Sequence, residues 1–269
     1  MRVSNVVGLA MMAALVAACG AEAPPAPAGP DLQTRELTYQ QDGTSLAGFV
    51  AWDAQTTGRR PGVLVVHEWW GHDDHVRNQA RRLAEAGYVG FALDIYGDGR
   101  HAEHPADAQT FMEEATKDPA VVMARFNAAR DALAQDPHVD PERIAAIGYC
   151  FGGAVVLNMA RSGADLDGVV SFHGALDAHV PAAPGQVQAP ILVLTGEADS
   201  MIPPDAVEAF RQEMTTAGAT FRIVTYPGAR HSFTNPGAGT HGMPELAYDQ
   251  AADEQSWQEM LRFFTEIFG

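Results

Sequence analysis

A cysteine between closely spaced glycines is the feature that most constrains how this chain can fold. Residues 148–153 read GYCFGG, so Cys150 has one glycine two positions before it and another two positions after it. Residues 143–147 form a short apolar run suited to a buried strand, and residues 154–160 continue as a mostly apolar helix. Because glycine has no Cβ, backbones can approach closely at these positions. The pattern predicts a sharp turn from strand to helix with the thiol exposed at its tip.

Two later residues follow predicted strands in an informative order. Asp199 lies in the loop after the apolar run 189–196, and His231 follows the run 221–226 and a Pro-Gly turn. Taken singly, a free cysteine is usually a small buried apolar residue, an aspartate after a strand usually caps a helix, and a histidine near a turn usually lies on the surface. The order nucleophile, acid, histidine is that of the α/β-hydrolase fold and differs from the chymotrypsin and subtilisin orders. The three residues are therefore predicted to form a catalytic triad.

The rest of the chain alternates between short apolar runs and helical stretches. Strands are expected at 35–39, 46–52, 61–66, 88–94, 143–147, 168–174, 189–196 and 221–226, and helices at 75–86, 106–117, 120–134, 154–160 and 245–268. We therefore expect an α/β-hydrolase fold, with a mostly parallel central sheet, helices on both faces and the ligand crevice at the carboxyl ends of the strands. The cap is expected to be minimal, with the Ala- and Pro-rich loop 176–188 bordering the pocket.

The segment after the run 61–66 adds a further motif. Residues 67–71 read HEWWG, and residues 231–233 read HSF. Together with GYCFGG and the intervening Asp199, these motifs resemble the dienelactone hydrolase family from about residue 34 to the C-terminus. The resemblance implies a compact α/β-hydrolase core, no cofactor and hydrolysis of carboxylic ester or lactone bonds through a thioester on the cysteine. A small-molecule ester or lactone is the expected partner.

The resemblance also implies a role for each motif residue. Cys150 would be the nucleophile, His231 the base and later the acid, and Asp199 the group that orients and stabilises the imidazolium. The backbone N–H groups of Trp69 and Phe151 would bind the oxyanion of the tetrahedral intermediate. One such donor typically contributes about 3 kcal/mol to transition-state stabilisation.

Glu68 is expected to lie beside the thiol. In the family this glutamate is implicated in taking the thiol proton when substrate arrives, so that the resting cysteine stays largely neutral. A neutral thiol resists oxidation better than a thiolate does. The alternative for Glu68 is an ordinary salt bridge or turn contact, because a carboxylate directly after a buried strand needs a partner.

The chain departs from the family in its substrate-binding residues. Family members that cleave dienelactones hold the substrate carboxylate with two arginines, whereas residues 94–100 here read DIYGDGR and Asn235 stands shortly after the histidine. Arg100 could reach the site from a shifted loop, but Asn235 lacks the charge and the two-pronged donor of a guanidinium. A substrate other than a dienelactone is therefore expected. The residues predicted to line the substrate pocket are Trp70, Tyr96, Arg100, Phe233 and Asn235.

Metal and nucleic-acid chemistry fit the sequence poorly. His67, His72 and His75 lie in a loop leading to a helix and lack the helical HExxH spacing of zinc enzymes, so no metal site is expected. The chain has 34 acidic and 17 basic residues, a net charge of −17, and no basic stripe to neutralise phosphates. A monomer with one large core and no nucleic-acid partner is expected.

The N-terminus reads as a separate segment. Residues 6–17 are apolar but fall short of the roughly 20 residues that span a bilayer, so residues 1–18 are predicted to be a signal peptide. Residues 16–20, VAACG, resemble the lipobox of bacterial lipoproteins, with Cys19 as the lipidated residue.

The segment after the predicted cleavage site suggests how the protein is held. Residues 19–33 are rich in Ala and Pro and would form a tether, and residues 34–269 would form the hydrolase domain. The protein is expected to be exported and lipid-anchored in the bacterial cell envelope, facing the periplasm, with no spanning segment. Ordinary cleavage after Ala18 would instead leave a soluble periplasmic protein.

Two other functional classes stay open at this stage. A cell-envelope binding lipoprotein could keep the fold and lose the chemistry, although every catalytic position is filled. A thiol acyltransferase or redox protein would need a second substrate in place of water. No resolving cysteine lies near Cys150, which disfavours a disulfide reductase.

Overall fold

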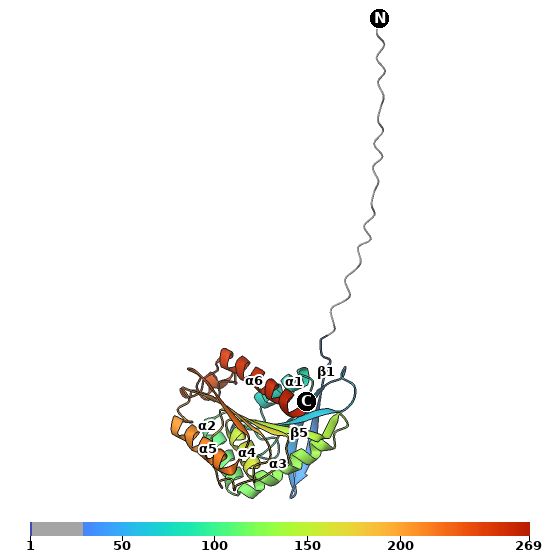
Figure 1. Ribbon diagram of the computed structural model, residues 1–269. Coiled ribbons are helices and arrows are strands. Elements are labelled where there is room, and N and C mark those ends of the chain that lie inside the picture. The colour runs from blue at the N-terminus through green and yellow to red at the C-terminus, as the bar shows by residue number, and fades with distance from the viewer. Residues whose placement is uncertain (2–28) are drawn as a thin grey trace.

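The computed structural model describes Met1 and residues 29–269, which contain one eight-stranded sheet flanked by helices (Figure 1). The strands are β1 (Leu32–Gln41), β2 (Thr44–Asp53), β3 (Arg60–Val66), β4 (Val89–Leu93), β5 (Val139–Tyr149), β6 (Gly168–Phe172), β7 (Ile191–Gly196) and β8 (Phe221–Tyr226). The helices are α1 (Asp74–Glu85), α2 (Pro105–Thr116), α3 (Pro119–Ala134), α4 (Phe151–Arg161), α5 (Pro204–Ala217), the short η1 (Ala238–His241) and α6 (Gln250–Phe268). The predicted signal peptide, its lipidated Cys19 and the first part of the predicted tether lie outside the described residues.

The sheet is mostly parallel, as predicted. Its strand order is β1-β2-β4-β3-β5-β6-β7-β8. β1 pairs antiparallel with β2 across the turn at Asp42 and Gly43, and β2 pairs antiparallel with β4. All the remaining pairs, from β4 through β8, are parallel. Parallel neighbours joined through helices confirm the α/β-hydrolase fold.

Several element boundaries differ from the expected ones by a few residues, and hydrogen bonds explain two of the differences. β1 begins at Leu32, two residues before the expected start of the domain, and the N–H of Asp31 donates to Asp53 Oδ1 at 2.9 Å. The last helix begins at Gln250 rather than at 245, because the side chain of Asp249 accepts a hydrogen bond from the first turn and caps it. Local hydrogen bonds set both ends.

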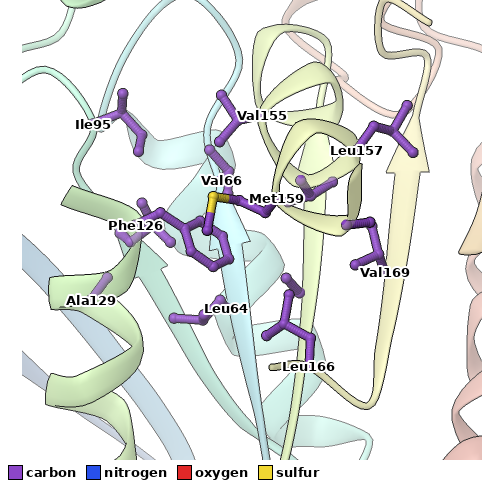
Figure 2. Packing of buried hydrophobic residues seen from close by; sticks show 14 of the residues in the cluster. Leu64, Val66, Ile95, Phe126, Ala129, Val155, Leu157, Met159, Leu166 and Val169 are labelled. Atoms are coloured by element: carbon purple, nitrogen blue, oxygen red, sulfur yellow. The ribbon is translucent and has the colours of Figure 1, made fainter. Parts of the chain in front are cut away.

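Helices cover both faces of the sheet, and each face has its own apolar core. Leu83 of α1 and Phe264 of α6 are buried on one face, while α3, α4 and α5 pack on the other (Figure 1). Figure 2 shows part of the second core, where Phe126 of α3 lies near Leu64 of β3 and Val155 of α4 lies near Val66 of the same strand. Strands covered on both faces are apolar on both sides, which explains why they read as continuous apolar runs.

The carboxyl ends of the parallel strands bring distant residues to one edge of the sheet. β3 is followed by Glu68 and Trp69, β5 by Cys150, β7 by Asp199 and β8 by His231. Ligand sites of open α/β sheets lie at this edge. In the described part of the chain, no helix combines the length and apolar character that a membrane span requires.

Candidate active site

Cys150 occupies a strained turn between β5 and α4. Its backbone has φ 51° and ψ −114°, a conformation that costs a non-glycine residue on the order of 1–3 kcal/mol. The flanking glycines are required, because a Cβ on Gly148 would lie 2.0 Å from the carbonyl oxygen of Gly152. The N–H of Cys150 also donates to the carbonyl of Phe172 in β6, at 3.0 Å. The predicted elbow is therefore present, with a half-buried thiol at its tip.

His231 and Asp199 form the second part of the site. Nδ1 of His231 donates to Asp199 Oδ2 at 2.8 Å, and both side chains are buried. Asp199 Oδ1 accepts from the N–H of Met201 at 2.9 Å, which orients the carboxylate. Nε2 of His231 has no hydrogen-bond partner among the described residues. One imidazole nitrogen is thus free to exchange a proton. His231 and Cys150 line the same cavity.

The charge balance around His231 favours its protonated form beside a thiolate. Burial alone lowers the pKa of His231, but the negative charge of a Cys150 thiolate and the hydrogen bond to Asp199 raise it well above its usual range. A thiolate and an imidazolium can therefore stabilise each other here, which is how cysteine nucleophiles are activated.

Two backbone N–H groups are available where an oxyanion would form. The amide of Phe151 is the first of α4, so it has no partner within the helix. No backbone hydrogen bond of the described residues uses the N–H of Trp69. The two segments are close because Gly152 packs against the end of β3, where a Cβ would lie 2.3 Å from the carbonyl oxygen of Val66. The hydroxyl of Tyr96 donates to the Trp69 carbonyl at 2.9 Å and helps hold this loop.

Glu68 is buried and held by residues that follow His231. Ser232 Oγ donates to its Oε1 at 2.6 Å, and Asn235 Nδ2 donates to its Oε2 at 2.7 Å. Glu68 is 2% exposed and is not among the residues that line the cavity. The two hydrogen bonds therefore tie its carboxylate to the segment after His231.

A cavity of about 620 Å³ opens over the thiol. Cys150, His231 and Trp69 line it at the catalytic end. The loop 176–188 borders it through Val180 and Pro181, as predicted. Its other walls come from α4 and from the junction between α2 and α3, which the sequence did not indicate as part of the site.

Comparison with known proteins identifies the family. The dienelactone hydrolase family model matches residues 46–268. This chain belongs to the dienelactone hydrolase family. The protein Usf of Aquifex pyrophilus is 28% identical over 243 residues, covering 86% of this chain and 97% of its own. A dienelactone hydrolase-like promiscuous phosphotriesterase from metagenomic libraries, P91, is 37% identical with a TM-score of 0.83, covering 89% of this chain and 100% of its own.

A more distant member shares the architecture. The dienelactone hydrolase of Anabaena variabilis is 21% identical with a TM-score of 0.62, and the match covers 88% of this chain and 99% of that one. The protein is thus a hydrolase of the dienelactone hydrolase family, with the family's fold.

The five residues predicted to line the substrate pocket do not line the cavity of this dienelactone hydrolase family member. Trp70 is 1% exposed and stacks on His241, with ring centroids 3.7 Å apart. Tyr96 is buried and bonds the Trp69 loop, and Phe233 is fully buried next to His173. These side chains follow strands, but they point into the molecule.

The remaining two predicted pocket residues are occupied elsewhere. Arg100 donates to Glu114 at 2.9 Å and to the carbonyl of Tyr96 at 2.8 Å, and it borders a separate surface recess. Asn235 is bonded to Glu68 and does not reach the cavity. Neither position supplies the carboxylate-binding arginines that dienelactone-cleaving family members use.

His173 is a residue of the site whose role the sequence did not reveal. It has φ 40° and is fully buried at the end of β6. Its Nδ1 accepts from the N–H of Cys150 at 3.2 Å, so Nε2 carries the proton and donates to Thr234 Oγ1 at 2.8 Å. Burial, aided by the nearby His231, lowers the pKa of His173 well below its usual range. A neutral histidine thus braces the elbow from behind.

The three histidines considered as metal ligands have other contacts. His67 Nδ1 donates to the carbonyl of Glu68 at 2.6 Å, and its Nε2 accepts from Ile95 at 3.3 Å. Nε2 of His72 donates to the carbonyl of Ala92 at 3.1 Å, and the ring of His75 packs edge-on against Tyr149. In residues 29–269, no group of three His, Cys, Asp or Glu side chains is placed to hold a metal ion.

Proposed function

We propose that the protein hydrolyses carboxylic ester or lactone bonds through a thioester on Cys150. The observation that carries the proposal is the juxtaposition in one cavity of the thiol at the strained elbow and the free Nε2 of His231, whose other nitrogen is bonded to Asp199. Nucleophile, base and orienting acid in this arrangement are the requirements of covalent acyl transfer.

The proposed reaction has two steps. The sulfur of Cys150 attacks the carbonyl carbon, and the N–H groups of Trp69 and Phe151 donate to the oxyanion that forms. The C–O bond then breaks, and His231 gives its proton to the departing alkoxide. In the second step His231 takes a proton from water, the hydroxide attacks the thioester, and the acid leaves as the thiolate returns.

Glu68 is the proposed first acceptor of the thiol proton, which must then pass to Nε2 of His231 before that nitrogen can protonate the leaving alkoxide. To reach the thiol, its carboxylate must exchange the hydrogen bonds from Ser232 and Asn235 for one from Cys150. Substrate binding beside Trp69, the next residue, is the event that would release it. In the absence of substrate the hydroxyl of Ser232 and the amide of Asn235 hold both oxygens of the carboxylate.

Turnover of a panel of esters and enol-lactones by the full-length protein tests the proposal. We expect hydrolysis by the wild type, loss of activity in Cys150→Ala and residual activity in Cys150→Ser. Mass spectrometry after a rapid quench should find an acyl group on Cys150. If the folded wild-type protein hydrolyses no ester faster than buffer does, the binding-lipoprotein hypothesis would replace the hydrolase proposal. Acyl transfer that requires an added acceptor would indicate an acyltransferase.

A phosphotriester belongs in the same panel. P91 is 37% identical and its name describes a promiscuous phosphotriesterase. Cleavage of a phosphotriester that is lost in Cys150→Ala would indicate that the elbow also accepts a tetrahedral phosphorus centre. Cleavage of carboxylic esters alone would restrict the site to planar carbonyls.

We propose further that the protein is exported and anchored by a lipid on Cys19. The supporting feature is the sequence VAACG after an apolar segment too short to span a bilayer. Fractionation of bacterial cells should place the wild type with the membranes and a Cys19→Ser variant in the soluble or uncleaved pool. A wild type found only in the soluble periplasmic fraction would support ordinary cleavage instead.

A further inference from the structure

One wall of the cavity is a single face of α4. The helix residues that line it recur every three or four positions, which is the spacing of one helical face. They are Phe151, Ala154, Val155, Asn158, Met159, Arg161 and Ser162. At about 1.5 Å of rise per residue, positions 150 to 162 extend about 18 Å. The cavity is therefore a groove that starts at the nucleophile and follows α4 to its C-terminal end.

The opposite wall of the α4 groove is also apolar. Met112 of α2 and Val122 and Met123 of α3 line it. Methionine side chains are flexible and adapt to ligands of different shape. At the mouth, Val180 and Met201 line the cavity while 74% and 50% exposed, although large apolar side chains of the described residues are otherwise mostly buried. The surface left in contact with water is thus suited to an apolar ligand.

The far end of the α4 groove carries no net charge. Arg161 donates to both carboxylate oxygens of Glu213, at 2.9 and 2.8 Å, and to the carbonyl of Leu176 at 2.6 Å. The amide of Asn158 donates back to the carbonyl of Ala154 in its own helix, at 3.0 Å. Nη1 of Arg161 is buried without a hydrogen-bond partner among the described residues, but the charge of the guanidinium is balanced by the carboxylate of Glu213. An uncharged chain fits this end better than a carboxylate does.

The reaction geometry decides which half of the substrate occupies the groove. The leaving oxygen must face Nε2 of His231 to receive its proton, and His231 lies at the catalytic end with Met201 and Leu246. In the tetrahedral intermediate the carbonyl carbon carries four substituents: the sulfur of Cys150, the oxyanion, the leaving oxygen and the chain of the acyl group. The acyl chain and the leaving oxygen therefore point in different directions. The acyl chain thus extends from Cys150 away from His231, along α4.

We propose that the α4 groove binds the acyl chain of the substrate, and that the natural substrates are esters or thioesters of medium or long aliphatic acids. The inference rests on the proposed thiol hydrolase function and adds the substrate class. A fully extended polypeptide spans about 3.3–3.6 Å per residue, and each residue contributes three backbone bonds, so an extended chain advances about 1.2 Å per bond. A groove of about 18 Å therefore accommodates on the order of a dozen carbons.

Two series of esters test this assignment in the full-length protein. One series lengthens the acyl chain of p-nitrophenyl esters from acetate to dodecanoate, and the other lengthens the alcohol of acetate esters. We expect kcat/KM to rise by roughly fourfold for each methylene that becomes buried in the acyl series. The alcohol series should change little, because the leaving group lies outside the groove.

Variants that fill the α4 groove at different distances from Cys150 measure how far the acyl chain extends along it. Asn158→Phe should reduce kcat/KM for decanoate, relative to that for acetate, by on the order of a hundredfold. Ala154 lies one helical turn, roughly 6 Å, nearer the thiol than Asn158. The longest acyl chain that Ala154→Phe accepts should therefore be about five carbons shorter than the longest chain that Asn158→Phe accepts. The matched control is Ala209→Phe on the exposed face of α5, which should behave as the wild type.

The outcomes separate this inference from the proposed function. Cys150-dependent hydrolysis that is indifferent to acyl length, or that follows alcohol length, overturns the acyl-chain assignment and leaves the thiol hydrolase standing. If no ester is hydrolysed, the hydrolase proposal fails. Calorimetric titration of Cys150→Ala with decanoic acid then tests whether the α4 groove binds an aliphatic chain. Binding that Asn158→Phe abolishes supports the groove, and no binding overturns it.

Discussion

At the residue scale, the site depends on polar side chains whose buried groups are individually satisfied. Both oxygens of Glu68 accept hydrogen bonds from neutral donors, Ser232 and Asn235, rather than from a cation. Ser232 has φ 56°, in the left-handed region, so the segment after His231 is strained to present these donors. A carboxylate buried without such partners would be costly. Ser232 and Asn235, which follow His231, therefore position Glu68 and do not line the cavity.

Removing one donor to Glu68 should reduce stability measurably. Asn235→Ala leaves one buried oxygen without its partner, and we expect the free energy of unfolding to fall by about 2 kcal/mol. Urea denaturation measures this change. In a Glu68→Gln background the same substitution should cost clearly less, because the charge is gone. Asn78→Ala, at an exposed site, is the control, and equal losses in both backgrounds would contradict the interpretation.

At the element scale, the elbow works because three backbones meet without side chains between them. β5 leads into α4 through Gly148 and Cys150, while Gly152 lies against the last carbonyl groups of β3. This contact places the first amide of α4 beside the loop that carries Trp69. The proposed oxyanion site therefore depends on how α4 and β3 pack, since its two donors, the N–H groups of Trp69 and Phe151, belong to segments far apart in the chain.

Gly152→Ala should separate α4 from β3. The added Cβ would lie 2.3 Å from the carbonyl oxygen of Val66 and 2.7 Å from that of His67, and backbone atoms cannot rotate away. We expect a loss of about 1–3 kcal/mol in the free energy of unfolding, as for other overpacked sites. Steady-state kinetics should show a larger fall in kcat than rise in KM, since the oxyanion donors act in the transition state.

A glycine with free space around it provides the comparison. A Cβ on Gly239 would have no atom within 4 Å, so Gly239→Ala should change neither stability nor kcat. Wild-type kcat in Gly152→Ala would show that the two N–H groups do not form the oxyanion site.

At the scale of the whole molecule, the sheet with its two covered faces buries ionisable groups far from water. His67 is fully buried between the sheet edge and the Phe151 and Tyr96 rings. Burial lowers the pKa of His67 from 6.5 to about 4. Between pH 6.5 and about pH 4, His67 is therefore mostly protonated in the unfolded chain and mostly neutral in the folded protein. Folding as a whole is linked to pH through such groups.

Acid should destabilise the protein partly through His67. Stability from the neutral ring is fully present above its unfolded pKa of 6.5 and is lost as the pH falls toward the folded pKa of about 4. Between about pH 7 and about pH 5 we expect this residue to remove about 2 kcal/mol from the free energy of unfolding. Urea titrations should find a shallower pH dependence for His67→Gln, whatever its absolute stability. An unchanged slope, as expected for the exposed control His104→Gln, would reject the linkage.

The sequence by itself determined the architecture and the three residues of the proposed triad. Strands covered on both faces appear as apolar runs, and the glycine spacing around Cys150 has few other physical uses. Asp199 and His231 could be found because each follows a strand whose carboxyl end must lie at the same edge. Local patterns suffice where backbone geometry alone places the residue.

Only the tertiary structure decided what surrounds Cys150, Asp199 and His231. Phe233 and Trp70 are neighbours of site residues along the chain, but side-chain direction depends on packing, and both point into the core. Asn235 meets Glu68 across 167 positions, a contact that no local pattern contains. The α4 groove arises where one face of α4 meets the junction of α2 and α3. A cavity is defined by how separate elements pack, so its walls cannot be identified from any one of them.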